Sequence, residues 1–227
     1  MSERPLAELL KSAAIEDCLV RWPAFRPRAG SEGDLVLEGR FGFRAVYQGV
    51  ELTGEFSLRI EIPRLFPAEL PLVFEIGGRI PRTWHRNLDS SLCLGAPIAL
   101  HQVLHASPDL ETFLEGCLVP YLYQFRVKER GGQLPLGDLP HGELGILSYY
   151  RDALLMPDIR AALASIRLLG MPRDIAALEL CPCGSGRVLA HCHSFFLDRL
   201  REVCSPSWFR RRYAELLNAV VREADNL

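Results

Sequence analysis

The sequence predicts an α+β fold in which a four-stranded antiparallel sheet follows an N-terminal helix and precedes a series of helices. Apolar and polar residues alternate over 56–62 with the period of two that a half-buried strand requires. Over 6–23 and 110–121, apolar residues recur at helical spacing instead. The chain of 227 residues is 48% hydrophobic and 24% charged, which is ordinary for a soluble globular protein. This length allows one medium domain with a small addition, or two small domains.

The predicted N-terminal helix ends at Pro23, and the strands that follow are expected at 35–39, 43–47, 52–62 and 72–76. Short turns between these strands favour an antiparallel meander. The segment 77–107 has no sustained periodicity and is expected to be a long functional loop. Ser107 is expected to cap the next helix, with Pro108 at its first position and Pro120 kinking or interrupting it.

The C-terminal half is expected to be helical. A second loop at 131–140 precedes predicted helices at 144–150, within 157–178, and in a basic amphipathic tail over 206–224 that begins at a Ser205-Pro206 cap. We therefore expect a domain over 1–155, a helical linker over 156–178, and a small module over 179–227.

Four residues of this module have the spacing of metal ligands: Cys181, Cys183, Cys192 and His193. Three thiolates and one imidazole are the preferred ligands of a closed structural zinc site, with no open position for catalysis. Gly184 and Gly186 permit the tight turn that two neighbouring thiolates need. His191 is an alternative ligand, but the adjacency of His193 to Cys192 favours His193. The string resembles the SEC-C motif, C-x-C-x8-C-[C/H], and this resemblance implies a small protein-docking module that holds structural Zn²⁺.

Cys93 stands in a polar stretch that contains Asp89, Ser90 and Ser91 and follows His85 and Asn87. A thiol nucleophile requires an accessible sulfur and an amide that can stabilise an oxyanion, and this stretch could supply both. Cys18 and Cys117 fall on apolar helix faces and are expected in the core, and Cys204 is expected at a helix end.

Several short passages resemble the ubiquitin-conjugating enzyme (UBC) fold, and in particular its divergent bacterial members. Residues 60–74 resemble the strand exit of that family, His85-Arg86-Asn87 resembles its His-Pro-Asn signature, and Leu92-Cys93-Leu94 resembles its cysteine motif. Ser107-Pro108 resembles the Trp-Ser-Pro that opens the next helix. The resemblance implies a UBC-like fold: N-terminal helix, four-stranded meander, catalytic loop and C-terminal helices.

Two departures bear on the candidate catalytic residues. Arg86 replaces the signature's proline, and Asn87 lies six positions before Cys93, about two fewer than is usual in the eukaryotic family. The family's downstream acidic residue has no obvious counterpart, so other local helpers come into question: Glu129, His101, His105 and His141.

The resemblance implies thioester transfer. An adenylating enzyme, acting in trans, would pass a ubiquitin-like modifier or the C-terminus of a cGAS-like nucleotidyltransferase onto Cys93, and a lysine amine of the target would then attack. Asn87 would stabilise the oxyanion, and His85 would hold the loop or shuttle a proton. Bacterial members of this kind act in anti-phage defence.

Other readings of the same residues remain open. Cys93 could be an inert thiol in a non-catalytic adaptor that binds protein through the UBC-like domain and the zinc module, and Asn87 could be a turn former. The basic tail, with Arg210, Arg211 and Arg212, could contact phosphates, but a net charge of −2 disfavours a nucleic-acid binder. The sequence has neither a secretory signal nor a run of about 18 apolar residues, so we expect a cytoplasmic protein without membrane contact.

Overall fold

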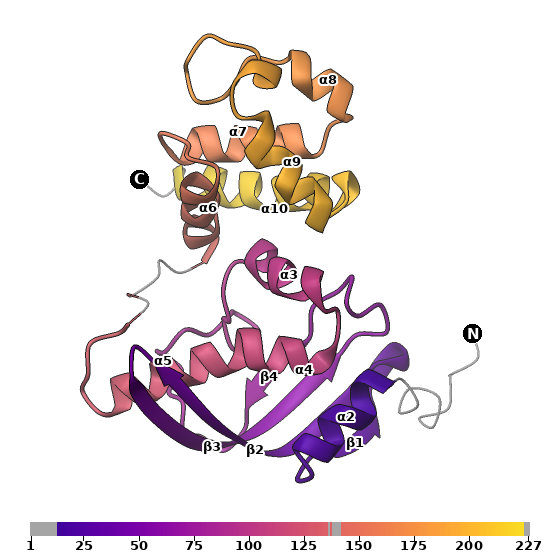
Figure 1. The fold of residues 1–227 in the computed structure, drawn as a ribbon, viewed down its shortest axis with the longest axis vertical. Helices are drawn as coiled ribbons and strands as arrows, with labels where there is room; N and C mark the ends of the chain where they lie inside the picture. The colour runs from indigo at the N-terminus through magenta and orange to yellow at the C-terminus, as the bar shows by residue number, and fades with distance from the viewer. Residues whose placement is uncertain (1–12, 136, 138–141, 225–227) are drawn as a thin grey trace. The chain divides into compact units, whose positions relative to one another are not determined.

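The computed structural model describes residues 13–135, 137 and 142–224, which form two compact units (Figure 1). Within the described residues, the first unit comprises 13–95, 99–135 and 137, and the second comprises 96–98 and 142–224. Each unit has its own cluster of buried apolar side chains. The division near residue 138 precedes the boundary expected at 155, because the helices of 142–178 share a core with those that follow.

The first unit contains a four-stranded antiparallel sheet with the order β1-β2-β3-β4. Its elements are α2 (Ala13–Arg21), β1 (Arg26–Ala29), a 3₁₀ turn (Ser31–Gly33), β2 (Leu35–Tyr47), β3 (Val50–Ile62), β4 (Leu72–Glu75), all but the first two residues of α3 (Pro97–Ala106), α4 (Leu110–Phe113), a π-helical turn (Leu114–Leu118) and α5 (Val119–Glu129). The α+β class with an antiparallel meander is therefore confirmed. Residues 6–12 of the predicted N-terminal helix lie outside the described residues.

The strands differ from the prediction in two ways. The two strands expected at 35–39 and 43–47 are one continuous strand, β2, which pairs along its whole length with β3. The edge strand β1 was not predicted, because its Arg26, Pro27 and Arg28 lack the alternating apolar residues of a half-buried strand. The sheet has four strands, of which β3 and β4 correspond to the strands expected at 52–62 and 72–76.

The helices after the sheet also differ in detail. The 77–107 segment was expected to be a loop, but its last part forms α3. Asp109, not Ser107, caps the next helix, and its carboxylate accepts a hydrogen bond from the Thr112 N–H at 2.7 Å. Pro120 interrupts the α-helical hydrogen bonds as predicted, because the turn before it is π-helical.

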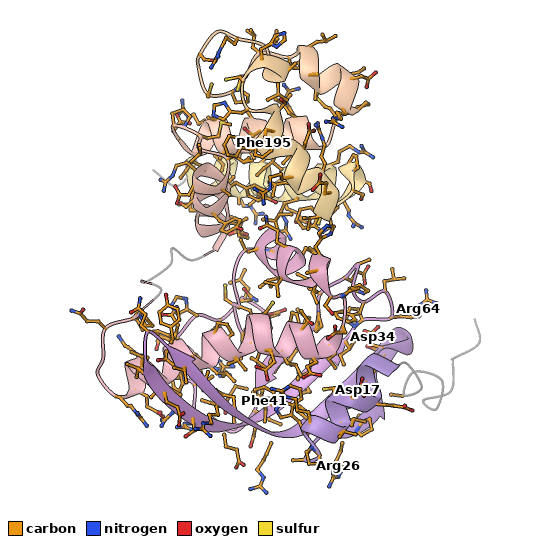
Figure 2. The ribbon with its side chains drawn as sticks, viewed as in Figure 1. Asp17, Arg26, Asp34, Phe41, Arg64 and Phe195 are labelled. Carbon is orange, nitrogen blue, oxygen red and sulfur yellow. The ribbon has the colours of Figure 1, made fainter. Side chains whose placement is uncertain are left out.

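One face of the sheet is covered by α4, the π-helical turn and α5, which follow one another across it (Figure 1). The aromatic rings of Trp22 and Phe41 stack in this core with centroids 5.0 Å apart, and Phe25 lies beside Phe41 at 6.1 Å. Phe41 is fully buried (Figure 2). Cys18 and Cys117 are buried in the same core, as predicted.

The second unit is helical. It comprises α6 (Gly142–Ala153), α7 (Ile159–Leu169), α8 (Arg173–Leu178), a 3₁₀ turn (Leu189–His191), α9 (Ser194–Val203) and α10 (Pro206–Ala224). The predicted helices at 144–150, within 157–178 and over 206–224 are confirmed, and the Ser205 hydroxyl accepts from the Trp208 N–H at the start of α10. Cys204 ends α9, as expected, and is buried.

Gly39 and Gly42 provide a stability test of the sheet. A methyl group on Gly39 would lie 2.2 Å from the backbone oxygen of Ala24, whereas a methyl group on Gly42 would meet nothing within 4 Å. We expect Gly39→Ala to lower the free energy of unfolding by about 2–3 kcal/mol, because a backbone group must move. Denaturant titration measures the loss. Gly42→Ala is the control in the same strand and should change stability by less than about 0.5 kcal/mol; equal effects would contradict the packing at Gly39.

Candidate functional site

The four predicted metal ligands come together in the second unit. The ligand atoms of Cys181, Cys183, Cys192 and His193 all lie within 4.8 Å of one another. His193 Nδ1 lies 3.3 Å from Cys181 Sγ and 3.1 Å from Cys192 Sγ, and the sulfurs of Cys183 and Cys192 are 3.5 Å apart. Tetrahedral zinc with ordinary bond lengths places such atoms about 3.6–3.8 Å apart. The cluster therefore has the atoms and nearly the spacing of a closed metal site.

The loop that carries these residues is folded tightly by its own backbone. Gly184 and Gly186 have φ values of +78° and +73°, a conformation that glycine adopts without strain. The Cys181 N–H donates to the Arg187 carbonyl at 2.8 Å, and Leu180 pairs with Val188 across the loop. The turn predicted from the two glycines is confirmed. His191 is exposed and outside the cluster, so the structure favours His193 over it.

Neighbouring polar groups stabilise thiolates in this loop. Hydrogen bonding, first from the Ser185 hydroxyl and also from the Ser185 backbone and the neighbouring thiols of Cys181 and Cys192, lowers the pKa of Cys183 to about 6. Burial acts in the opposite direction on Cys181, which is 4% exposed. Arg187 donates to Cys192 Sγ at 3.5 Å, as outer groups around thiolate ligands commonly do. This set of ligands and donors fits a structural zinc ion.

Cys93 lies in a small hairpin over 85–93 in the first unit. Its N–H donates to the His85 carbonyl at 2.8 Å, and Arg86 pairs with Leu92 as an antiparallel bridge. The Leu92 N–H donates to the Val73 carbonyl at 2.7 Å, which attaches the hairpin to β4. Cys93 is half-buried, and burial raises its pKa above the ordinary value of 9.0, while a hydrogen bond from the Gly95 backbone lowers it in part. The hairpin thus holds a thiol that is partly accessible and largely protonated at neutral pH.

Asn87 and His85 both shape this hairpin. The Asn87 amide donates to Ser91 Oγ at 2.9 Å and to the Leu92 carbonyl at 3.5 Å, and the Asn87 N–H donates to the Ser91 carbonyl. His85 has a φ of +33°, and its ring meets that of Trp84 edge-on at 4.5 Å. Turn formation by Asn87 and loop support by His85 are therefore visible, and their catalytic roles stay predictions.

Two residues next to the hairpin, Tyr121 and Glu75, were not predicted as part of a site. The hydroxyl of Tyr121, on α5, donates to the same His85 carbonyl that accepts from Cys93. Burial raises the pKa of Tyr121, and the charges of Arg86, Cys93 and Glu75 also act on it. Glu75 lies at the end of β4 and pairs with Arg86. In the sequence, Tyr121 was marked only by a hydroxyl on an apolar helix face, and Glu75 only by a carboxylate at a strand position that is buried in the structure.

The structure describes three of the four suggested helper residues, Glu129, His101 and His105. Glu129 is bound by Arg79, with 2.9 Å between Oε2 and Nη2, and also by Arg126, and hydrogen bonding from Arg79 lowers its pKa. His101 is buried within α3, and His105 lies in the last turn of that helix. His141 lies outside the described residues. The structure therefore gives Glu129 a role in linking Arg79 and Arg126.

The basic run of α10 is partly used within its own unit. Arg210 donates to the Gly170 carbonyl at 2.8 Å, and Arg212 pairs with Glu215 at 2.9 Å and lies over the Trp208 ring. Arg211 is exposed. These contacts give two of the three arginines a structural role.

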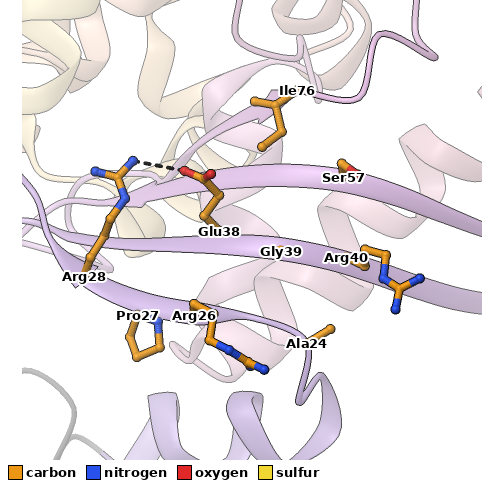
Figure 3. A pocket seen from close by; sticks show the side chains of 9 residues that line it. All are labelled: Ala24, Arg26, Pro27, Arg28, Glu38, Gly39, Arg40, Ser57 and Ile76. Carbon is orange, nitrogen blue, oxygen red and sulfur yellow. Dashed lines mark hydrogen bonds and ion pairs between the residues drawn. The ribbon is translucent and has the colours of Figure 1, made fainter.

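A hollow of about 550 Å³ opens on the outer face of the sheet (Figure 3). Glu38, Arg40 and Ser57 line it and alternate along their strands with buried residues, so they point away from the core. Arg28 also lines it and pairs with Glu38 at 3.1 Å, and Arg40 pairs with Glu55 at 3.4 Å. None of the candidate site residues lines this hollow.

Comparison with known proteins identifies the metal-ligand loop. The SEC-C motif matches residues 179–194, so this chain carries that motif, and its Cys/His cluster could bind metal. No curated protein and no solved structure matches the chain. Among the described residues, no helix is both long and apolar enough to cross a membrane.

Zinc binding by histidine variants should show which of the two histidines in the loop, His191 or His193, is the metal ligand. We expect the wild-type protein to retain zinc after purification, measured by elemental analysis, and to lose thermal stability in chelator. His193→Ala should weaken zinc binding by more than the roughly 10–100-fold that substitutions around a site cause, because it removes a ligand. His191→Ala is the control and should bind zinc as the wild type does. Equal loss in both variants would contradict the ligand set.

Proposed function

We propose that this protein is a ubiquitin-conjugating-like cysteine acyltransferase that carries a ubiquitin-like modifier as a thioester on Cys93. A zinc-bound SEC-C module in the second unit would serve as a separate site for binding protein partners. The modifier, or the C-terminus of a cGAS-like nucleotidyltransferase, would arrive from an adenylating enzyme, and an amine of the target would receive it.

The order of elements in the first unit supports this proposal. A helix, α2, precedes a four-stranded antiparallel meander, and the segment with Cys93 follows β4 and precedes the helices that cover the sheet. This is the order that the resemblance to the UBC fold implies. The motif matches at His85-Arg86-Asn87 and Leu92-Cys93-Leu94 also fall on facing strands of one hairpin.

The single observation that carries the proposal is the setting of Cys93 among the seven cysteines. Three of these, Cys181, Cys183 and Cys192, belong to the metal cluster, and three others are buried: Cys18, Cys117 and Cys204. Cys93 is half-buried and its backbone is fixed by the His85 carbonyl. A nucleophile requires this combination, because the carbonyl under attack must reach a sulfur that is held in place.

The chemistry would proceed in two transfers. The Cys93 thiolate attacks the carbonyl carbon of the modifier's thioester on the activating enzyme; a new C–S bond forms, and the activating enzyme's thiolate leaves. A lysine amine of the target then attacks the Cys93 thioester, forming a C–N bond and releasing the Cys93 thiolate, while the amine gives up a proton to solvent or a base. The metal ligands take no part in either step.

Asn87 would act on the oxyanion that develops in both steps. An amide donor aimed at such an oxygen contributes about 2.7–4 kcal/mol in other acyl-transfer enzymes. The Asn87 Nδ2 donates to Ser91 Oγ and the Leu92 carbonyl, within the hairpin that carries Cys93. To serve an oxyanion, the amide would redirect one hydrogen away from these acceptors.

A non-catalytic adaptor is the second candidate function, and two observations favour it. Burial raises the pKa of Cys93, which reduces the thiolate fraction at neutral pH. The Asn87 amide already has acceptors in its own hairpin. In that case the sheet unit and the SEC-C module would both bind protein, and Cys93 would form no thioester.

Adduct formation tests the transferase directly. The protein is mixed with ATP and with a cognate adenylating enzyme and modifier, and adducts are resolved with and without reducing agent. We expect a thiol-sensitive adduct on the wild type, none on Cys93→Ala, and a thiol-resistant oxyester on Cys93→Ser. Cys204→Ala, a buried cysteine in the other unit, is the control. An adduct that survives Cys93→Ala would refute the assignment.

The pH dependence of Cys93 alkylation tests its environment without any partner. Because burial raises the folded-state pKa above 9.0, the thiolate fraction at Cys93 should rise about tenfold for each pH unit between 7 and 9, with no plateau in that range. Iodoacetamide labelling followed by peptide mass spectrometry measures the rate. A plateau below pH 8 would show instead that the thiol is activated in the folded protein.

A further inference from the structure

The carboxylate of Glu75 organises the start of the segment that leads to Cys93. Glu75 ends β4, and its side chain is 0% exposed. Its Oε1 accepts from the N–H groups of Gly77 at 3.0 Å and Arg79 at 3.2 Å, and its Oε2 accepts from the Ile80 N–H at 3.3 Å. A buried carboxylate with three backbone donors defines the path of the chain from 77 to 80.

Arg86 joins this turn to the Cys93 hairpin. Its Nη2 lies 3.4 Å from Glu75 Oε2 and donates to the Ile80 carbonyl at 2.7 Å, while its Nη1 donates to the Ser90 carbonyl at 3.1 Å. The Arg86 side chain is 11% exposed. One guanidinium therefore binds the end of β4, the turn at 77–80 and the far side of the hairpin at the same time.

From these contacts we infer that the Glu75–Arg86 ion pair positions the hairpin that presents Cys93, so that both are positioning residues for the thiol. The backbone of Arg86 lies between His85, whose carbonyl binds the Cys93 N–H, and Asn87. Because the backbones of His85 and Asn87 hydrogen-bond to those of Cys93 and Ser91, fixing the position of Arg86 restrains both sides of the hairpin. The inference rests on the proposed function only in taking Cys93 as the reacting group.

The chemistry of the pair suits positioning better than stability. A buried ion pair gains little net stability, because desolvation of both charges offsets their attraction. The Arg86 Nε is buried and has no hydrogen-bond partner among the described residues, which adds to that cost. The planar fork of the guanidinium reaches two carbonyls in different segments, and a lysine ammonium cannot reproduce that geometry. The His-Pro-Asn signature has a proline ring that restricts the backbone at this position. In this chain the Arg86 side chain instead contacts three groups, the Glu75 carboxylate and the carbonyls of Ile80 and Ser90.

Two conservative variants test the inference on the full chain. Glu75→Gln keeps the size of the side chain but removes its charge, and Arg86→Lys keeps the charge but not the fork. We expect both to raise the alkylation rate of Cys93 by at least about threefold at pH 8 and to shift its pH profile to lower pH, because a loosened hairpin leaves the thiol less buried. Iodoacetamide labelling with peptide mass spectrometry gives the rates, and thermal unfolding gives the stability of each variant.

Leu52→Val is the matched control, because it weakens the buried core of the same sheet at the end remote from β4. If it changes Cys93 alkylation as much as the two variants do, a general loss of stability is responsible and the inference is overturned. A folded Glu75→Gln protein with wild-type rate and pH profile also overturns it. If Glu75→Gln does not fold, Arg86→Lys decides in the same way.

Transfer assays distinguish this inference from the proposed function. If the wild type forms no thioester with the activating enzyme but the variants alter Cys93 alkylation, the transferase is wrong and the positioning role stands. If the wild type transfers the modifier and alkylation of the variants is unchanged, the positioning role is wrong and the transferase stands. The two results come from separate reactions on the same protein preparations.

Discussion

The burial of Glu75 at the end of β4 constrains the rest of the first unit's candidate site. An uncompensated carboxylate in a core is very costly, so the chain around it must supply donors. Three of them come from the backbone at 77–80 and one from Arg86, and each contact fixes a segment that has no regular secondary structure of its own. The hairpin with Cys93 is built outward from this carboxylate, with Val73 and Tyr121 adding one bond each.

The sequence predicts the parts of this fold whose signals are local. Alternation over 56–62 gives β3, and a Ser-Pro cap followed by helical spacing gives α10 to the residue. The prediction divided β2 into two strands because Gly39 and Gly42 interrupt its apolar pattern. In the structure, pairing with β3 continues past both glycines. β1 was missed because an edge strand buries little, and α3 was missed because its apolar residues spread over a wide arc.

The two candidate sites differ in predictability for the same physical reason. All four metal ligands lie within 13 residues, and the glycines that shape their loop lie between them, so sequence spacing nearly determines the geometry. The surroundings of Cys93 come from β4, the 77–80 turn and α5, which only the folded sheet brings together. Nothing in the sequence indicates that the Tyr121 hydroxyl will donate to the His85 carbonyl that also binds Cys93.

The resting state of Cys93 sets a requirement for any transfer reaction. Burial raises its pKa, which reduces the thiolate fraction, and the Asn87 amide donates to Ser91 and Leu92 in the isolated chain. A metal ion held by three sulfurs and one nitrogen would have no open coordination position, so it could not take over the roles of the Cys93 thiol and the Asn87 amide. A transferase would then use a bound partner that alters the hairpin's surface without breaking the Glu75–Arg86 pair. An adaptor needs no such change, so the response of Cys93 to partner binding is where the two proposed functions diverge.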